Sequence, residues 1–183
     1  MSPTSGLVLL CVDLQPPFLA AIPDRVSVQR RCAFAIAVAA GLEIDTVFTE
    51  QVPEKLGGTA PELLRLVATP AVFGKTTFSA LADEAIRDAI LARKTEHLLL
   101  CGIETSVCIY QTALAALAAG LQVTLLSDAV AARRIDDAQV CLAALARAGV
   151  HVLPSETVFY ALLRDATHPF FKSYAQLVKA HAG

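Results

Sequence analysis

Short apolar runs and segments with helical periodicity alternate along most of this 183-residue chain. The first apolar run covers residues 7–12, and apolar positions recur at helical spacing over residues 26–40. An apolar run of this length is typical of a strand that is buried on both faces. Strands separated by helices form a parallel sheet through right-handed crossovers, with helices on both faces. The pattern therefore predicts an α/β fold, a Rossmann-like three-layer sandwich.

Further apolar runs continue the alternation, so we predict a mainly parallel sheet of six strands. The later strands are expected at residues 44–49, 71–73, 96–101, 121–126 and 150–153. Helices are expected at residues 62–67, 79–92 with Ser79 as N-cap, 107–119 and 136–148, and peripheral helices at 155–163 and 169–180. Residues 51–61 are the one long irregular stretch, which either covers an active site or is a surface excursion.

Length and composition limit the classes of protein that this chain can be. A chain of 183 residues suits one domain, which we expect to span residues 1–183. A hydrophobic share of 55% with 17% charged residues excludes a disordered chain. A net charge of −2 without a Lys/Arg cluster gives no footprint for nucleic acid. We therefore expect a small-molecule substrate.

Five cysteines scattered through apolar runs do not resemble the disulfide framework of a secreted protein. Residues 1–6, which precede the first strand, are too few for a signal peptide. No apolar run reaches the roughly 18 residues that a membrane span needs. We predict a soluble protein in the cytoplasm with no membrane partner.

Cys108 follows one predicted strand and opens a predicted helix, with a turn at residues 102–106 between them. Unpaired backbone N–H groups and the positive end of the helix dipole converge at such a position. Thiolates at helix N-termini have lowered pKa values and attack carbonyl carbons, whereas a core cysteine is inert. We therefore interpret Cys108 as a nucleophile held as an anion, and we expect Cys11 and Cys101, inside strands, to be inert.

Asp13 and Lys75 each follow a predicted strand, at the same rim of the sheet as Cys108. Ligands of an open parallel sheet bind beyond the carboxyl ends of its strands. An unpaired Asp13 carboxylate would be costly among apolar neighbours, and Lys75 can supply its partner. Asp13 would then take the thiol proton while Lys75 favours the anionic forms. The alternative is an ion pair at a strand end beside an idle thiol.

The chain resembles the isochorismatase-like cysteine hydrolase superfamily over almost its whole length, and in particular its small isochorismatase domain-containing members. The resemblance rests first on Asp13 after its strand, on Gly74 and Lys75, and on residues 102–108 followed by residues 111–113. Further matching segments are residues 49–51, residues 128–130 with Arg133, residues 148–150, Ser155 with Glu156, and His168 with Pro169.

By position, this resemblance implies that Asp13, Lys75 and Cys108 form a catalytic triad. It also implies a cis peptide bond between Ile103 and Glu104, with the backbone N–H groups of Glu104 and Cys108 forming an oxyanion hole. The implied reaction cleaves the C–N bond of a small amide through a Cys108 thioester, without a cofactor. A homo-oligomer, a dimer or larger, is the implied assembly.

Two departures from the family pattern narrow the implied chemistry. The nicotinamidase branch of the family carries a metal site built on an Asp-x-His motif and a second histidine, yet residues 45–53 contain no histidine. The histidines at positions 97, 151, 168 and 181 have no ligand spacing, so we predict no bound metal. Enzymes that cleave isochorismate, a vinyl ether, generally lack the cysteine, so Cys108 favours amides.

Gln15, Phe18 and Glu50 are candidate substrate-binding residues at the same rim. Each has a structural alternative, because Gln15 can hold the turn that follows it, Phe18 can belong to the core and Glu50 can be a solvated strand-end carboxylate. Phe78 can likewise line a pocket or belong to the core, and an aromatic near a strand end more often belongs to the core. Asp128, at the end of the fifth predicted strand, could approach the site, but we expect it to bind loop N–H groups in an Asx-type turn.

Three other classes of function share parts of this pattern. A dinucleotide-binding protein would need a Gly-x-Gly-x-x-Gly turn after its first strand, where this chain has Asp-Leu-Gln-Pro-Pro. A thiol redox protein would need a Cys-x-x-Cys pair, which the chain lacks. The remaining alternative is a catalytically silent protein of the same fold that acts through protein–protein contacts. The reactivity of Cys108 separates this alternative from the hydrolase.

Overall fold

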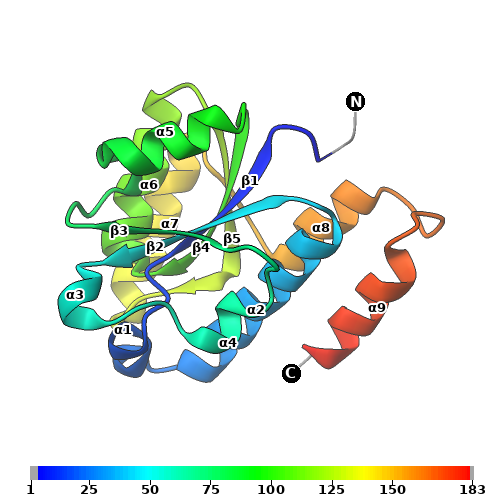
Figure 1. Ribbon diagram of the computed structural model, residues 1–183, viewed down its shortest axis with the longest axis horizontal. Coiled ribbons are helices and arrows are strands. Elements are labelled where there is room, and N and C mark those ends of the chain that lie inside the picture. The colour runs from blue at the N-terminus through cyan, green and yellow to red at the C-terminus, as the bar shows by residue number, and fades with distance from the viewer. Residues whose placement is uncertain (1–3, 182–183) are drawn as a thin grey trace.

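The computed structural model describes residues 4–181, which contain a six-stranded sheet with neighbouring strands parallel throughout (Figure 1). The order of the strands across the sheet is β3-β2-β1-β4-β5-β6. The strands are β1 (Leu7–Val12), β2 (Asp45–Gln51), β3 (Ala71–Lys75), β4 (His97–Ile103), β5 (Gln122–Ala131) and β6 (His151–Leu153). The predicted fold class is therefore confirmed.

Helices cover both faces of this sheet (Figure 1). One face carries α5 (Glu84–Ala92), α6 (Tyr110–Ala118) and α7 (Ile135–Arg147), and the other carries α2 (Arg25–Gly41), α8 (Ser155–Leu163) and α9 (Phe171–Ala180). Successive residues of a strand point to opposite faces. In β1, Val8 and Leu10 therefore join the core on the α5 side, while Leu9 and Cys11 join the core on the α2 side.

Short helices follow the carboxyl ends of β1 and β2, and two of them occupy segments for which the sequence predicts a turn or a loop. Helix α1 (Pro16–Ala21) follows β1 closely and begins with proline, whose fixed φ suits the first helical position. The predicted irregular stretch at residues 51–61 contains α3 (Pro53–Leu56), whereas α4 (Pro61–Leu64) corresponds to the helix predicted at residues 62–67 and ends earlier than predicted. Helices as short as α1 and α3 carry too little periodicity to be recognised from their apolar positions.

The predicted N-cap at Ser79 is wrong. Ala80–Ala82 form a 3₁₀ turn, η1, and α5 begins only at Glu84. The N-cap of α5 is Asp83, whose carboxylate accepts hydrogen bonds from the backbone N–H groups of Ala85 and Ile86. Aspartate caps a helix as well as serine does, so residue type alone did not separate the two positions.

Strand β5 continues to Ala131 instead of ending near residue 126, because its pairing with β4 shifts register between Leu100 and Gly102. Asp128 therefore lies inside this strand. Its carboxylate accepts hydrogen bonds from the backbone N–H and the hydroxyl of Ser155, at 2.8 and 2.7 Å. It also accepts one from Nε of Arg31 at 2.8 Å. The structural role expected for Asp128 is confirmed, but its partners are the distant residues Arg31 and Ser155 and not the loop of an Asx-type turn, so it fastens both α2 and α8 to the sheet.

The strand order reverses between β1 and β4, at the centre of the sheet. In open parallel sheets, ligands bind at the carboxyl ends of the strands beside such a switch point. Gly102 lets these two strands approach closely, since its φ is +116° and a Cβ atom there would lie 2.1 Å from the carbonyl oxygen of Val12. Asp13 and Cys108 follow β1 and β4, so both lie next to the switch point.

Within residues 4–181, no helix combines the length and the apolar character that a membrane span requires. The five cysteines are free thiols. The sulfur atoms of Cys11 and Cys101 lie 3.5 Å apart in the core. This contact with Cys11, together with burial, raises the pKa of the Cys101 thiol well above its usual value, which agrees with the inert character expected for a strand cysteine.

Candidate functional site

Asp13 comes directly after β1, and its carboxylate is buried. Its backbone N–H donates to the carbonyl oxygen of Thr49 in β2 at 3.0 Å. The hydroxyl of Thr49 donates to Oδ1 of Asp13 at 2.8 Å, and Nζ of Lys75 donates to Oδ2 at 2.7 Å. Each carboxylate oxygen therefore has a donor, which is what a buried charge needs.

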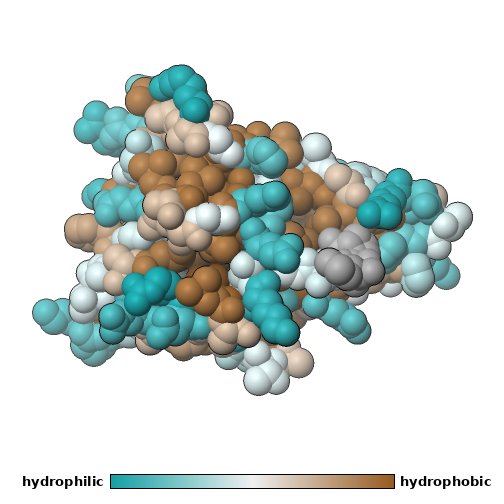
Figure 2. Space-filling model, turned by 90° about the horizontal axis from the view of Figure 1, so that it is seen from above, coloured by the Kyte–Doolittle hydropathy of each residue, from teal (hydrophilic) through white to brown (hydrophobic). Residues whose placement is uncertain are grey.

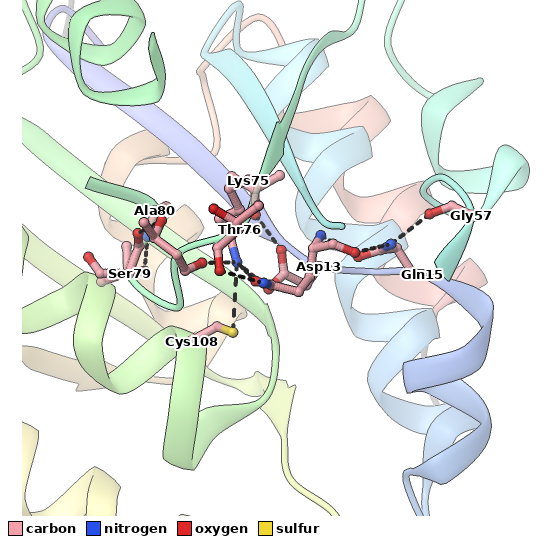
Figure 3. Close-up of polar contacts among 12 residues, drawn as sticks. Asp13, Gln15, Gly57, Lys75, Thr76, Ser79, Ala80 and Cys108 are labelled. Carbon is pink, nitrogen blue, oxygen red and sulfur yellow. Dashed lines mark hydrogen bonds and ion pairs between the residues drawn. The ribbon is translucent and has the colours of Figure 1, made fainter. Parts of the chain in front are cut away.

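Lys75 is the last residue of β3, and its side chain reaches past the end of β2 to Asp13 (Figure 3). The ammonium group is fully buried and faces a carboxylate that is 1% exposed. It also donates to Oε1 of Gln51 at 2.5 Å and to the carbonyl oxygen of Thr77 at 3.2 Å. The sulfur of Cys108 lies 3.8 Å from Nζ. The structure thus brings the predicted ion pair and the thiol into one buried site.

Cys108 lies in η2 (Thr105–Ile109), a π-helical turn that leads from β4 into α6. The residue is 7% exposed, and its sulfur is directed toward the Lys75 ammonium (Figure 3). Single π-helical turns are frequent at functional sites. Cys108 does stand in the first helical turn after the strand, as the sequence predicts.

The low pKa predicted for Cys108 is wrong for the site without substrate. Burial first, and then the negative charge of Asp13, raise the pKa of the Cys108 thiol to about 12. The Lys75 ammonium lowers this pKa, but it does not offset burial. The position at a helix start is visible in the sequence, whereas the depth of burial is not. The thiol is therefore protonated at neutral pH and needs a base to become a nucleophile.

The peptide bond between Ile103 and Glu104 is cis. A hydrogen bond from the backbone of Glu104 lowers the pKa of Cys108, which is the effect of an N–H donor directed at the sulfur. The carbonyl oxygen of Glu104 is engaged elsewhere, since it accepts from the N–H groups of Val107 and Ile109 at 3.1 Å each. The lowering by the Glu104 backbone is the smallest of the effects on the pKa of Cys108.

Asp13 and Cys108 lie in the wall of a pocket of about 180 Å³. Most of the lining is apolar and comes from Phe18, Ala21, Ile22, Phe78, Ile103 and Val107. The polar lining residues are Asp13, Gln51, Glu104, Cys108 and Arg133. Small-molecule sites typically combine an apolar wall with a few polar groups. The pocket suits a small and largely apolar molecule whose reacting group reaches Cys108.

Glu104 and Arg133 form an ion pair in the pocket wall. Nε of Arg133 lies 2.9 Å from Oε2 of Glu104, and the backbone N–H of Arg133 donates to Oε1 at 3.1 Å. The side chain of Arg133 is 64% exposed and that of Glu104 is 18% exposed. The pair therefore stands at the solvent side of the pocket. The sequence pointed to Arg133 only through the family resemblance, because the two residues belong to different strand-end segments.

The three residues predicted to bind substrate have different surroundings in the structure. Phe18 lines the pocket and also packs against the core on the α2 side. Gln15 is fully buried, and its amide binds the backbone of Gln51 at both ends. Oε1 of Glu50 accepts from the backbone N–H of Thr59 at 2.6 Å. Neither Gln15 nor Glu50 is among the residues that line this pocket, and both bind the backbone of the segment that ends β2 and follows it.

Two further residues of the pocket were not among the predicted site residues. Phe78, for which a place in the core was favoured over one in the pocket, is 55% exposed and lines the pocket. Gln51 is 7% exposed and contacts the Lys75 ammonium. A signal for Gln51 was present, because it ends the strand next to β1 and so stands at the same rim as Asp13.

The charged groups of the buried site are the Asp13 carboxylate and the Lys75 ammonium. In the part of the chain that the structure describes, no group of three or more His, Cys, Asp or Glu side chains is arranged to hold a metal ion. The positive charge beside Asp13 and Cys108 is the ammonium of Lys75.

A family model described as the isochorismatase domain matches residues 7–157, a range that contains the whole buried site. The chain belongs to the isochorismatase family of hydrolases. The resemblance read from the sequence is therefore confirmed. The chain is 40% identical over 178 residues to isochorismatase domain-containing protein 2 of Bos taurus, with 97% of this chain and 84% of that protein covered.

Solved structures of the isochorismatase fold agree with this membership. The MAR1 ribonuclease from Caenorhabditis elegans matches with a TM-score of 0.90 at 31% identity, covering 96% of this chain and 91% of that chain. YcaC from Escherichia coli, described as an octameric hydrolase of unknown specificity, matches with a TM-score of 0.92 at 21% identity. The latter match covers 98% of this chain and 89% of that chain, and at this identity it shows the fold alone.

Proposed function

We propose that this isochorismatase-family protein hydrolyses the C–N bond of a small amide through a thioester at Cys108. The observation that supports the proposal most directly is the meeting of three side chains in one buried site. Nζ of Lys75 lies 2.7 Å from the Asp13 carboxylate and 3.8 Å from the Cys108 sulfur, at the wall of a small apolar pocket. A base, a cation and a nucleophile in contact are the groups that amide hydrolysis needs.

In the proposed mechanism, Asp13 takes the proton of the Cys108 thiol. Because the pKa of this thiol is about 12, the transfer accompanies attack on the amide carbon and does not precede it. The Lys75 ammonium contacts both groups, so it stabilises negative charge on either of them during the transfer.

The sulfur then forms a bond with the amide carbon, and the carbonyl oxygen becomes an oxyanion. The backbone N–H groups of Glu104 and Cys108 are the proposed donors to this oxygen, and one such donor is worth about 3–4 kcal/mol in known hydrolases. Asp13 returns its proton to the nitrogen as the C–N bond breaks, so the amine leaves and the thioester remains. Asp13 next deprotonates a water molecule that attacks the thioester, and the acid and the Cys108 thiol are released. These steps need no cofactor.

The lining of the pocket favours a small apolar amide over a polynucleotide. RNA cleavage is the second candidate function, because the worm relative described as a ribonuclease is 31% identical to this chain. The cation among the lining residues is Arg133, which is already paired with Glu104, and the chain has a net charge of −2. Phosphate recognition normally relies on unpaired Lys and Arg side chains.

Release of ammonia from a panel of small primary amides tests the proposal, with propionamide, isobutyramide and benzamide as its first members. We expect turnover of at least one amide by the wild-type protein and none by the Cys108→Ala variant. Turnover that survives in the variant would refute the mechanism. Absence of turnover together with cleavage of a labelled single-stranded RNA would favour the nuclease. A protein silent in both assays would favour the non-catalytic alternative, which acts through protein–protein contacts.

We also propose a homo-oligomer, a single domain over residues 1–183 and a cytoplasmic location. Apolar surface is exposed on the face shown in Figure 2 on both sides of a column of polar side chains, and exposed apolar patches can mark interaction sites. Ile135 and Val140 of α7 are large apolar side chains that are 70% and 68% exposed. The single domain is supported by Phe159 and Tyr174, which lie beyond the residues that the family model matches and are buried in the core on the α2 side. The cytoplasmic location is supported by the free cysteines, which suit a reducing compartment.

A further inference from the structure

The direction of the Lys75 ammonium is set by oxygen atoms. An ammonium group carries three N–H donors and no acceptor. Its oxygen partners are Oε1 of Gln51 at 2.5 Å, Oδ2 of Asp13 at 2.7 Å and the carbonyl oxygen of Thr77 at 3.2 Å. The sulfur of Cys108 is farther away, at 3.8 Å. These three oxygen atoms can accept the three N–H groups of the ammonium. Gln51 is the partner that binds through an uncharged side chain.

The amide of Gln51 has only one orientation that satisfies its neighbours. Its Nε2 donates to the carbonyl oxygen of Thr76 at 3.0 Å, and that oxygen can only accept. Its Oε1 accepts from Nζ of Lys75, which can only donate. Exchanging the two atoms would place a donor against the ammonium and an acceptor against the carbonyl group. The position therefore needs a side chain that accepts at one atom and donates at the other.

The backbone of Gln51 is held as firmly as its side chain. Oε1 of Gln15 accepts from the backbone N–H of Gln51 at 2.7 Å, and Nε2 of Gln15 donates to the Gln51 carbonyl oxygen at 3.1 Å. The same Nε2 donates to the carbonyl oxygen of Gly57 at 2.6 Å (Figure 3). Gln15 is fully buried and stands at the start of α1. Its hydrogen bonds to the Gln51 backbone, together with the bond from the Gln51 side chain to Lys75, connect the start of α1 to the ammonium group.

We propose that Gln51 is a positioning residue, whose side-chain oxygen holds the Lys75 ammonium beside Asp13 without adding negative charge near Cys108. This inference rests on the proposed function, since it assigns Gln51 a part in that same site. A second carboxylate here would compete with Asp13 for the ammonium and would disfavour the thiolate. An apolar side chain would leave a buried N–H donor without its acceptor. A neutral amide avoids both effects.

The first test is the pH dependence of Cys108 alkylation by iodoacetamide, followed by mass spectrometry of the Cys108 peptide. Gln51→Glu keeps the shape of the side chain and adds a negative charge. We expect it to shift the alkylation profile by about one pH unit to the alkaline side, which makes alkylation about tenfold slower at a given pH. The matched control is Gln122→Glu, because Gln122 is exposed at the start of β5, and this variant should leave the profile unchanged.

The second test uses Gln51→Met, which removes the acceptor and adds no charge, so it also serves if Gln51→Glu fails to fold. We expect kcat for the best amide of the panel to fall about tenfold while KM changes less than about twofold, as for loss of an interaction that acts in the transition state. In a Lys75→Met background the same change should cause no further loss, because the group that Gln51 positions is absent. A residue that only lines the pocket would instead raise KM in both backgrounds.

An unshifted alkylation profile in Gln51→Glu, or an equal effect of Gln51→Met with and without Lys75, would overturn the role of Gln51. Failure of the proposed function has a different signature. A wild-type protein that releases no ammonia from any amide refutes the hydrolysis, while the alkylation profiles still test Gln51. A wild-type protein that hydrolyses amides while its Gln51 variants behave like wild type refutes the role of Gln51 alone.

Discussion

Asp13 and Lys75 act on the pKa of the same thiol in opposite directions. The Asp13 carboxylate raises the pKa of Cys108, and the Lys75 ammonium lowers it, while burial exceeds both effects. Asp13 therefore opposes a free thiolate at rest, and in the proposed mechanism it accepts the thiol proton during attack. Lys75 lowers the pKa of Cys108 because its positive charge stabilises the thiolate.

Substitution of these two residues should separate the two roles. Asp13→Asn removes the base, so amide hydrolysis should fall by about 10²–10⁴-fold. The same change removes a negative charge, so the pKa of Cys108 falls and alkylation by iodoacetamide at pH 9 should become faster. Lys75→Met should slow both reactions, because the thiol loses the cation that lowers its pKa. Parallel loss of both reactions in Asp13→Asn would contradict this assignment and make Asp13 a stabiliser of the thiolate.

The pH dependence of alkylation follows from the raised pKa of Cys108. A thiol with a pKa of about 12 has a thiolate fraction that increases about tenfold for each pH unit below that value. The alkylation rate of Cys108 in the wild-type protein should therefore rise without a plateau between pH 7 and pH 10. Stopped-flow or quenched labelling measures this directly. A plateau that begins near pH 8 would show a thiolate already formed at rest.

The residues that meet in the buried site were predictable from the sequence, but the electrostatic state of the Cys108 thiol was not. Residues that follow apolar strands in a parallel sheet share one rim, and this placed Asp13, Lys75 and Cys108 together. The sequence also marked Cys108 as the start of a helix, yet it could not show how deeply the thiol is buried. Gln15 and Glu50 stand at the same rim, but their side chains bind the neighbouring backbone. The spacing of residues along the sequence does not predict the direction in which such a side chain points.

At the level of elements, the site depends on how closely β1 and β4 approach. Long apolar strands and helices were predictable because their periodicity extends over many residues. The register shift between β4 and β5, the π-helical turn η2 and the short helix α1 were not, since each involves only a few residues and depends on contacts with other segments. Strands β1 and β4 pair directly from Leu7 with His97 to Val12 with Gly102, so their carboxyl ends lie beside each other.

Gly102→Ala should disrupt this approach. The new Cβ would lie 2.1 Å from the carbonyl oxygen of Val12 in the adjacent strand, and φ is +116°. We expect a loss of at least about 3 kcal/mol in the free energy of unfolding, measured by urea denaturation. Gly120→Ala is the matched control, because its φ is also positive, at +81°, but no heavy atom lies within 4 Å. It should lose only about 1 kcal/mol. Equal losses would show that backbone strain and not the strand contact matters at Gly102.

At the level of the whole molecule, the strand order 3-2-1-4-5-6 accounts for the location of the site. Alternation of strands and helices predicts a parallel sheet covered on both faces, but not which strands are neighbours, because that depends on the direction of each crossover. Once β1 and β4 are adjacent and β3 lies two strands away, a residue at the end of β3 needs a long side chain to reach the switch point. Lysine meets that need at position 75.

The exposed apolar side chains of α7 lead to a prediction about assembly. Large apolar groups as exposed as Ile135 and Val140 are unfavourable in water, and self-association would bury them. Light scattering of the purified protein at micromolar concentration should give a molar mass at least about twice the 19.3 kDa of one chain. A mass equal to that of a single chain would refute the homo-oligomer.

Trapping of the acyl group on Cys108 tests the central claim most directly. Hydroxylamine intercepts a thioester, so wild-type protein incubated with an active amide and hydroxylamine should form the acyl hydroxamate, and the Cys108 peptide should carry the acyl group when the reaction is quenched with acid. Cys108→Ala should form neither product. Hydrolysis of the amide by the Cys108→Ala protein, or turnover by the wild-type protein without any acyl group on Cys108, would contradict the account.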